Sequence, residues 1–187
     1  MRLCVFCGSR TGADPRFAQV AVELAGVLAD RGIGIVYGGG RVGLMGILAD
    51  AARARGAEVV GVIPKSLAER EVAHSGLSEL HLVESMHDRK AFMGELSSGF
   101  IALPGGFGTL EEFCEVITWS QLGLHRKPCG LLNVAGYFDP LIAMFDRAVN
   151  EGFISLENRA IVVEARTPRE LVEFVVKRAL ENNLSAG

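Results

Sequence analysis

Short apolar runs alternate along the chain with longer amphipathic segments. Most of the short runs are rich in Val, Ile, Leu and Phe with little polar alternation, which is typical of parallel strands buried on both faces. They predict strands at Arg2–Phe6, Gly34–Tyr37, Glu58–Ile63, His81–Val83, Phe100–Leu103, Gly130–Val134 and Ala160–Val163.

The longer segments have the pattern of helices packed on a sheet. They predict helices at Pro15–Arg31, Leu44–Arg55, His87–Ser97, Leu110–Leu122, Pro140–Glu151 and Pro168–Asn182. Gly32 and Gly56 follow the first two, where glycine commonly ends a helix. Alternation of buried strands with helices predicts an α/β fold: a Rossmann-like, doubly wound parallel sheet flanked by helices, in a single domain spanning 1–187.

Residues of unusual composition come directly after several predicted strands. Gly8-Ser9-Arg10 follows the first strand, a glycine triplet follows the second, MHDRK (86–90) follows the fourth, and PGGFGT (104–109) follows the fifth. In an open parallel sheet, ligands bind outside the carboxyl ends of the strands. We therefore expect these loops to converge on one rim and form a single ligand site.

Two of the loops are rich in glycine and each opens a predicted helix. Glycine lets the backbone approach a ligand closely, and the free N–H groups at a helix start attract an anion. GGGRVGLMG (38–46) and PGGFGT would therefore cradle a phosphate. The acidic residue that a dinucleotide site needs about 20 residues later is at best Glu58, and no P-loop with Gly-Lys-Ser/Thr is present. Tight turns without a ligand remain the alternative.

Composition excludes several other classes of protein. The chain has 187 residues, 49% of them hydrophobic and 22% charged, with a formal net charge of −3. It has no basic surplus for holding nucleic acid. No apolar stretch reaches the roughly 18 residues that span a bilayer. The first residues predict a strand rather than a secretory signal, so we expect no membrane association and a cytoplasmic location.

The cysteines and histidines do not predict a metal or redox site. Cys4 and Cys7 form a C-x-x-C, but residues three apart in a strand point to opposite faces, and no second pair completes a zinc site. We expect these two, Cys114 and Cys129 to be reduced thiols. None of the four histidines has metal-ligand spacing.

Several motifs together resemble one family. PGGFGTLEE matches the PGGxGTxxE motif of the LOG family, the cytokinin riboside 5′-monophosphate phosphoribohydrolases, which were often mislabelled lysine decarboxylases. CVFCGS, YGGGRVGLMG, MHDRKAFM and the stretch from FIALPGGFGT to CGLLN are similar to that family in order and spacing, from residue 2 to about 165. The resemblance implies a Rossmann-like fold, a homodimer or higher oligomer, no cofactor, and adenosine 5′-monophosphates, plain or N6-modified, as substrates.

The resemblance assigns catalysis to Arg89 and Glu112. From the residues alone, Glu112 has two interpretations of equal weight: a catalytic carboxylate, or the closing residue of a capping box that starts at Thr109. Arg89 follows the S-x-x-D box at Ser85, which predicts a helix start. It could bind phosphate or polarise the departing base, or it could be an exposed arginine in a weak ion pair.

Lys90 is the residue that a Schiff-base mechanism would need, but the sequence offers no partner set for pyridoxal phosphate, so we assign it to substrate binding. Thr118 matches a substrate-contacting threonine of the family, or bonds its own helix backbone. Glu71, in the irregular stretch Pro64–Glu79, matches a family glutamate by its spacing from Arg89. The expected substrate-binding set is Gly8, Ser9, Gly39, Gly40, Glu71, Lys90, Gly105, Gly106, Phe107, Gly108, Thr109, Leu110, Glu111 and Thr118.

Two functions of different classes remain open. The first is hydrolysis of the N-glycosidic bond of a nucleoside 5′-monophosphate; the second is non-catalytic binding of a nucleotide or of the molybdenum cofactor, because related Rossmann modules do this and fold alone does not separate them. A carrier needs the glycine cradle but not the Arg89 and Glu112 pair. The apolar excess of the helices at Leu110–Leu122 and His87–Ser97 predicts burial by a second copy in a homodimer.

Overall fold

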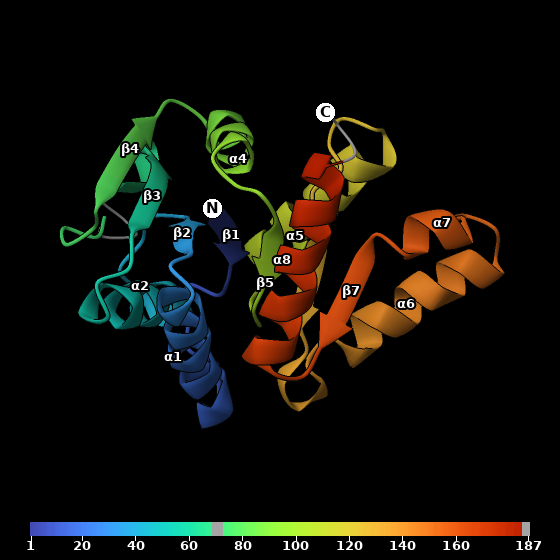
Figure 1. Ribbon diagram of the computed structural model, residues 1–187, viewed down its shortest axis with the longest axis horizontal. Coiled ribbons are helices and arrows are strands. Elements are labelled where there is room, and N and C mark those ends of the chain that lie inside the picture. The colour runs from blue at the N-terminus through green and yellow to red at the C-terminus, as the bar shows by residue number, and fades with distance from the viewer. Residues whose placement is uncertain (69–72, 185–187) are drawn as a thin grey trace.

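The computed structural model describes residues 1–68 and 73–184, and a seven-stranded sheet forms its centre (Figure 1). Its strands lie within one or two residues of the predicted positions. They are β1 (Arg2–Phe6), β2 (Gly34–Tyr37), β3 (Val59–Pro64), β4 (Glu79–Val83), β5 (Phe100–Ala102), β6 (Cys129–Leu132) and β7 (Val162–Ala165).

All strand pairs are parallel, in the order β4-β3-β2-β1-β5-β6-β7. The chain winds outward from β1 to β4, returns to the centre, and then winds the other way from β5 to β7. This confirms the Rossmann-like, doubly wound sheet. The direction of winding changes between β1 and β5, so their carboxyl ends form the crevice in which such sheets bind ligands.

Helices cover both faces of the sheet. They are α1 (Pro15–Asp30), α2 (Gly43–Ala54), α3 (Lys65–Ala68), α4 (Met86–Glu95), α5 (Phe107–Gln121), η1 (Val134–Gly136, a 3₁₀ turn), α6 (Asp139–Asn150), α7 (Leu156–Arg159) and α8 (Pro168–Leu184). The sequence pattern missed α3, η1 and α7, which are too short to show a helical period. Gly32 and Gly56 follow α1 and α2 with φ of 64° and 74°, as expected of glycines that end helices.

The sheet separates two hydrophobic cores. One lies under α1, α2 and α8 and includes Leu3 and Val5 of β1; the other lies under α4 and α5 and includes Cys4 and Phe6. Cys7 joins the first core, so the two cysteines of the C-x-x-C face opposite sides of the sheet. All four cysteines are free thiols, as predicted.

Of the two capping boxes predicted at helix starts, the one at α4 is correct and the one at α5 is wrong. Ser85 and Asp88 form the predicted capping box at the start of α4, with the Asp88 N–H donating to Ser85 Oγ at 3.0 Å. The capping box at Thr109 does not exist, because α5 begins at Phe107 with Gly106 as its N-cap. Glu112 therefore lies in the body of α5, and its capping interpretation is wrong.

The two edges of the sheet differ. Figure 1 shows β4 at one edge, while α6 and α7 lie beyond β7 at the other. α6 has no fully buried residue, although Leu141, Ile142 and Phe145 pack partly against the second core. Among the described residues, no helix combines the length and apolarity needed to cross a membrane.

Candidate active site

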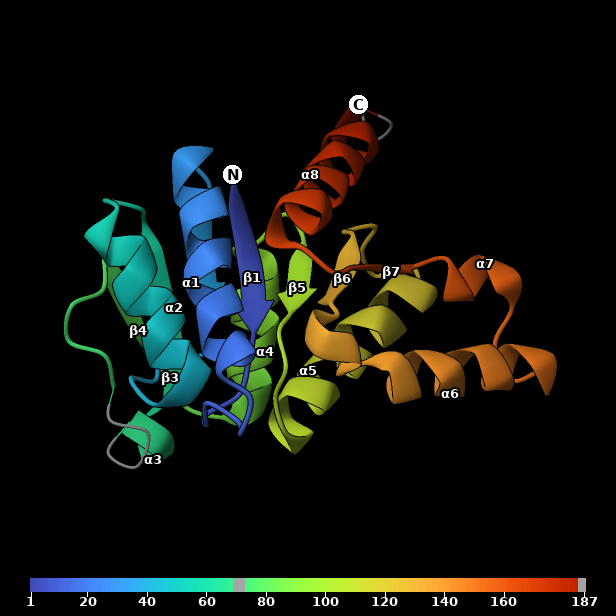
Figure 2. The ribbon, with the colours of Figure 1, turned by 90° about the horizontal axis from the view of Figure 1, so that it is seen from below.

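The loops after β1 and β5 enclose a pocket of about 360 Å³ at the point where the winding direction changes. β1 runs downward in Figure 2, so this rim is at the bottom of that view, near the start of α5. The pocket wall includes Gly8, Ser9, Arg10, Pro104, Gly105 and Tyr137. The pocket occupies the position expected of a ligand site in a sheet of this kind.

Gly8 and Gly105 are glycines because the two loops touch through their backbones. The Gly8 N–H donates to the Pro104 carbonyl at 3.1 Å. A Cβ on Gly8 would lie 3.2 Å from Gly105 Cα, and a Cβ on Gly105 would lie 2.1 Å from Thr109 Oγ1. Internal packing therefore requires both glycines, independently of any ligand.

Gly106 and Gly108 have no such internal requirement. A Cβ on either would meet nothing within 4 Å, and neither has a positive φ. The N-cap of α5 is Gly106, which has no side chain that could bond to the N–H groups of the first turn. An open, positively polarised helix start flanked by bare glycines suits an anion that approaches from outside the chain.

Arg89 of α4 and Glu112 of α5 meet at the same rim. Their side chains are 6% and 11% exposed, and Arg89 Nη2 lies 3.9 Å from Glu112 Oε1. Glu112 follows Thr109 by three residues and shares its face of α5. Neither Glu112 nor Arg89 is among the residues that line the pocket, whose wall reaches Gly106, the N-cap of α5. Two complementary buried charges at a ligand rim form a common arrangement of catalytic groups.

The first glycine of the triplet after β2 makes room for Arg89. Arg89 Nη2 donates to the Gly38 carbonyl at 3.2 Å, and a Cβ on Gly38 would lie only 1.9 Å from that nitrogen. Nη1 is 3.6 Å from Met86 Sδ, a weak acceptor, and the buried Nε has no hydrogen-bond partner among the described residues. The guanidinium is thus held in place while part of its donor capacity is unused.

The thiol beside the pocket is not a nucleophile in this arrangement. Burial and then the nearby Glu112 carboxylate raise the pKa of Cys7, and the same two causes raise the pKa of Cys4. Because only the thiolate is reactive, both cysteines remain protonated and inert at neutral pH.

Lys90 ties α4 to α5. Its Nζ lies 2.5 Å from Glu111 Oε1 and 2.9 Å from Glu115 Oε2, and its side chain is 12% exposed. Burial lowers the pKa of Lys90, but the two carboxylates outweigh burial and leave it raised. Lys90 and Glu111 thus contact each other in this structure, and their contacts with substrate stay a prediction.

Other residues of the predicted site have different surroundings. Gly39 and Gly40 are buried; the Gly39 carbonyl accepts from the His74 N–H at 3.0 Å, and Gly40 bridges to Ala73. Leu110 packs partly against the second core. Thr118 is exposed, with its hydroxyl donating to the Cys114 carbonyl at 2.8 Å, as its alternative interpretation expects.

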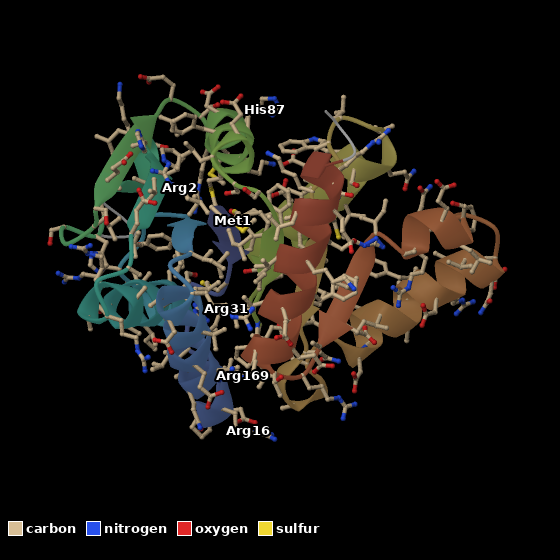
Figure 3. All side chains as sticks on the ribbon, in the orientation of Figure 1. Met1, Arg2, Arg16, Arg31, His87 and Arg169 are labelled. Atoms are coloured by element: carbon tan, nitrogen blue, oxygen red, sulfur yellow. The ribbon has the colours of Figure 1, made fainter. Side chains whose placement is uncertain are left out.

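Phe107 and Glu71 complete the description of the predicted site residues. Phe107 is 93% exposed at the first position of α5. Glu71 lies outside the described residues. His87 lies on the outer side of α4 (Figure 3), and no cluster of three potential metal ligands occurs in the described part of the chain. The pocket also includes Arg10 and Tyr137, which the sequence pattern did not single out.

Comparisons with a family model and with known proteins point to the same family. Residues 45–175 match the family model described as possible lysine decarboxylase. Over 171 residues the chain is 53% identical to the cytokinin riboside 5′-monophosphate phosphoribohydrolase LOG of Oryza sativa subsp. japonica, covering 91% of this chain and 71% of that protein. It is also 53% identical over 171 residues to LOG7 of Arabidopsis thaliana, covering 91% and 79%.

Solved structures show the same architecture at lower identity. The molybdenum cofactor binding protein of Rippkaea orientalis superposes with a TM-score of 0.71 at 21% identity, covering 94% of this chain and 95% of that one. This likeness concerns the fold alone.

Proposed function

Since the chain belongs to the family of the LOG cytokinin riboside 5′-monophosphate phosphoribohydrolases, we propose that it hydrolyses the N-glycosidic bond of AMP or of N6-substituted AMP. The products are the free base and ribose 5-phosphate. The observation that carries the proposal is the buried Arg89 and Glu112 pair beside an uncapped helix start.

The phosphate is bound at the start of α5. The N–H groups of its first turn point outward, and the absence of side chains at Gly106 and Gly108 lets a phosphate approach them closely. Ser9 and Arg10, which line the same pocket, supply a hydroxyl and the positive charge of a guanidinium. Binding of this remote group fixes the ribose beside the catalytic pair.

Glu112 acts on the ribose. As the bond from C1′ to the base nitrogen breaks, its electron pair leaves with the base and positive charge develops on the sugar. A buried carboxylate stabilises that charge and orients the water whose oxygen forms the new bond to C1′. The spare donors of Arg89 polarise the departing base, and a proton from the water completes the base. Atoms and charge balance without a cofactor.

A decarboxylase mechanism through Lys90 does not suit this geometry. A Schiff-base lysine must be neutral to attack a carbonyl, which usually means a lowered pKa. Lys90 is held between two carboxylates and its pKa is raised. The description in the family model's name is therefore a poor guide to the chemistry of this chain.

The carrier alternative draws its support from the fold of the molybdenum cofactor binding protein alone. A carrier needs the glycine cradle but not the buried pair of Arg89 and Glu112. Incubation with AMP, followed by chromatography, separates the two functions. Adenine and ribose 5-phosphate in equal amounts support the hydrolase; tight binding of AMP without either product supports the carrier.

We also propose that the protein is a homodimer in the cytoplasm, where its nucleotide substrates occur. Some apolar residues of α4 and α5, such as Met93 and Val116, are buried in the second core of the chain itself, while others, such as Trp119, are only partly buried against it. The exposed apolar side chains instead include Leu122 after α5, Met144 on α6 and Phe153 beyond it, at 65%, 59% and 85% exposure. A second copy would cover them. Light scattering at micromolar concentration tests this, and a fully active monomer would refute it.

A further inference from the structure

A tight turn between β6 and α6 places a tyrosine beside the glycine-rich loop. Asn133 is 4% exposed; its Oδ1 accepts from the Phe138 N–H at 2.8 Å, and its Nδ2 donates to Asp139 Oδ1 at 2.7 Å. Between them, Ala135 has a φ of 54°, which a non-glycine residue rarely adopts. The asparagine clamp thus stabilises an unfavourable turn, and the residue that the turn presents to the pocket is Tyr137.

Tyr137 makes one directed contact with the loop. Its hydroxyl donates to the Gly105 carbonyl at 2.5 Å, across 32 residues of sequence. The ring is held by the edge of Phe17, with centroids 5.5 Å apart, and by buried Phe138 at 5.0 Å. Both rings fix the direction of the hydroxyl, so the bond to Gly105 is preorganised.

The carbonyl that Tyr137 binds belongs to a peptide that has no side chain on either side to restrict its orientation. The Gly105–Gly106 peptide has glycine on both sides, and a side chain on Gly106 would meet nothing within 4 Å. In a trans peptide the carbonyl and the N–H point in opposite directions. A donor that fixes the Gly105 carbonyl therefore also fixes the Gly106 N–H, which immediately precedes the N–H groups of the first turn of α5.

We propose that Tyr137 is a positioning residue for phosphate: its hydroxyl sets the orientation of the Gly105–Gly106 peptide, and so aims the backbone donors at the substrate's phosphate. The proposal deepens the hydrolase function and rests on it. It differs from a purely structural role, because it predicts an effect on phosphate affinity that is separate from stability and from the chemical step at Glu112.

The substitution Tyr137→Phe tests this, since it removes the hydroxyl and keeps the ring packed on Phe17 and Phe138. Loss of a hydrogen bond of ordinary net strength corresponds to a change in affinity of about two- to tenfold. We expect the KM for AMP and the dissociation constant for inorganic phosphate, measured by calorimetry, to rise together by roughly that factor. We expect kcat and the melting temperature to change little.

Tyr37→Phe is the matched control. The Tyr37 hydroxyl is buried at the end of β2 with no hydrogen-bond partner among the described residues, so the same chemical change there leaves phosphate affinity unaltered. Phosphate affinity of Tyr137→Phe equal to that of the wild type would overturn the proposal, as would a loss confined to kcat and stability. If neither the wild type nor Tyr137→Phe cleaves AMP, but phosphate still binds more weakly to Tyr137→Phe, the hydrolase function fails and the positioning role stands.

Discussion

Gly38→Ala should disable the enzyme without unfolding it, because the added methyl group would occupy the position of the Arg89 guanidinium. The new Cβ would lie 1.9 Å from Arg89 Nη2 and 3.3 Å from Met45 Sδ. The guanidinium would have to retreat by about 1.5 Å or more to reach ordinary contact distance. It would then lose its bond to the Gly38 carbonyl and its position opposite Glu112.

The expected losses in activity and stability differ in size. A displacement of about 1 Å in a catalytic group can lower activity by about 10²-fold, and we expect a fall of that order in kcat/KM for AMP. Overpacking costs typically about 1–3 kcal/mol of folding free energy. We expect the lower end here, since the group that moves is the end of a long side chain.

The assay combines chromatographic measurement of adenine release with thermal unfolding of the same samples. Gly94→Ala is the matched control: it lies on α4 with Arg89, and a Cβ there would meet Trp119 at 3.5 Å, an ordinary contact. We expect the control to keep wild-type activity. If folded Gly38→Ala also kept wild-type kcat/KM, the position of Arg89 would be irrelevant to the reaction and the reasoning would be refuted.

Two further predictions concern the substrate and the lysine. Adenosine should have a kcat/KM at least about 10²-fold below that of AMP, since it lacks the charged hydrogen bonds at the start of α5, each worth about 1.5–3 kcal/mol; equal values in a steady-state comparison would remove the reason for the phosphate cradle. Lys90→Met should retain base release and lose about 1–3 kcal/mol of stability in thermal unfolding, because it breaks the ion pairs between α4 and α5; loss of all activity at an unchanged melting temperature would show that Lys90 takes part in the chemistry.

The sheet could be predicted from sequence because its signals are local. Strands such as β2 and β3 are continuous apolar runs, and Gly32 and Gly56 mark the ends of the helices between them. The position of the pocket followed from the same pattern, since the carboxyl ends of parallel strands share one rim. The doubly wound topology could be predicted from the alternation of buried strands and helices along the chain.

The start of α5 was mispredicted because local and tertiary preferences conflict there. Thr109 followed by Glu112 has the spacing of a capping box, and Gly108 is a poor helix former. In the structure, Thr109 instead packs against Gly105, and the helix extends back to Phe107. Packing between loops, which the local sequence does not encode, decides where this helix begins.

The roles of the site residues that could not be predicted from sequence depend on contacts between distant segments. The role of Gly38 depends on Arg89, which is 51 residues away, and that of Tyr137 depends on Gly105. The ion pairs of Lys90 require that α4 and α5 lie side by side on the second face of the sheet. A single sequence contains these residues without indicating which of them meet.

The most direct test of the account is the rate of base release from AMP by Glu112→Gln, measured per folded molecule beside the wild type. Glutamine preserves the size of the side chain and removes the charge that stabilises the developing positive charge on the ribose. Glu112 lies beyond the first turn of α5, whose N-cap is Gly106, and glutamine is a good helix former, so the variant should fold. The account predicts a fall in kcat of at least about 10²-fold. A folded variant with kcat within about twofold of the wild type would contradict it.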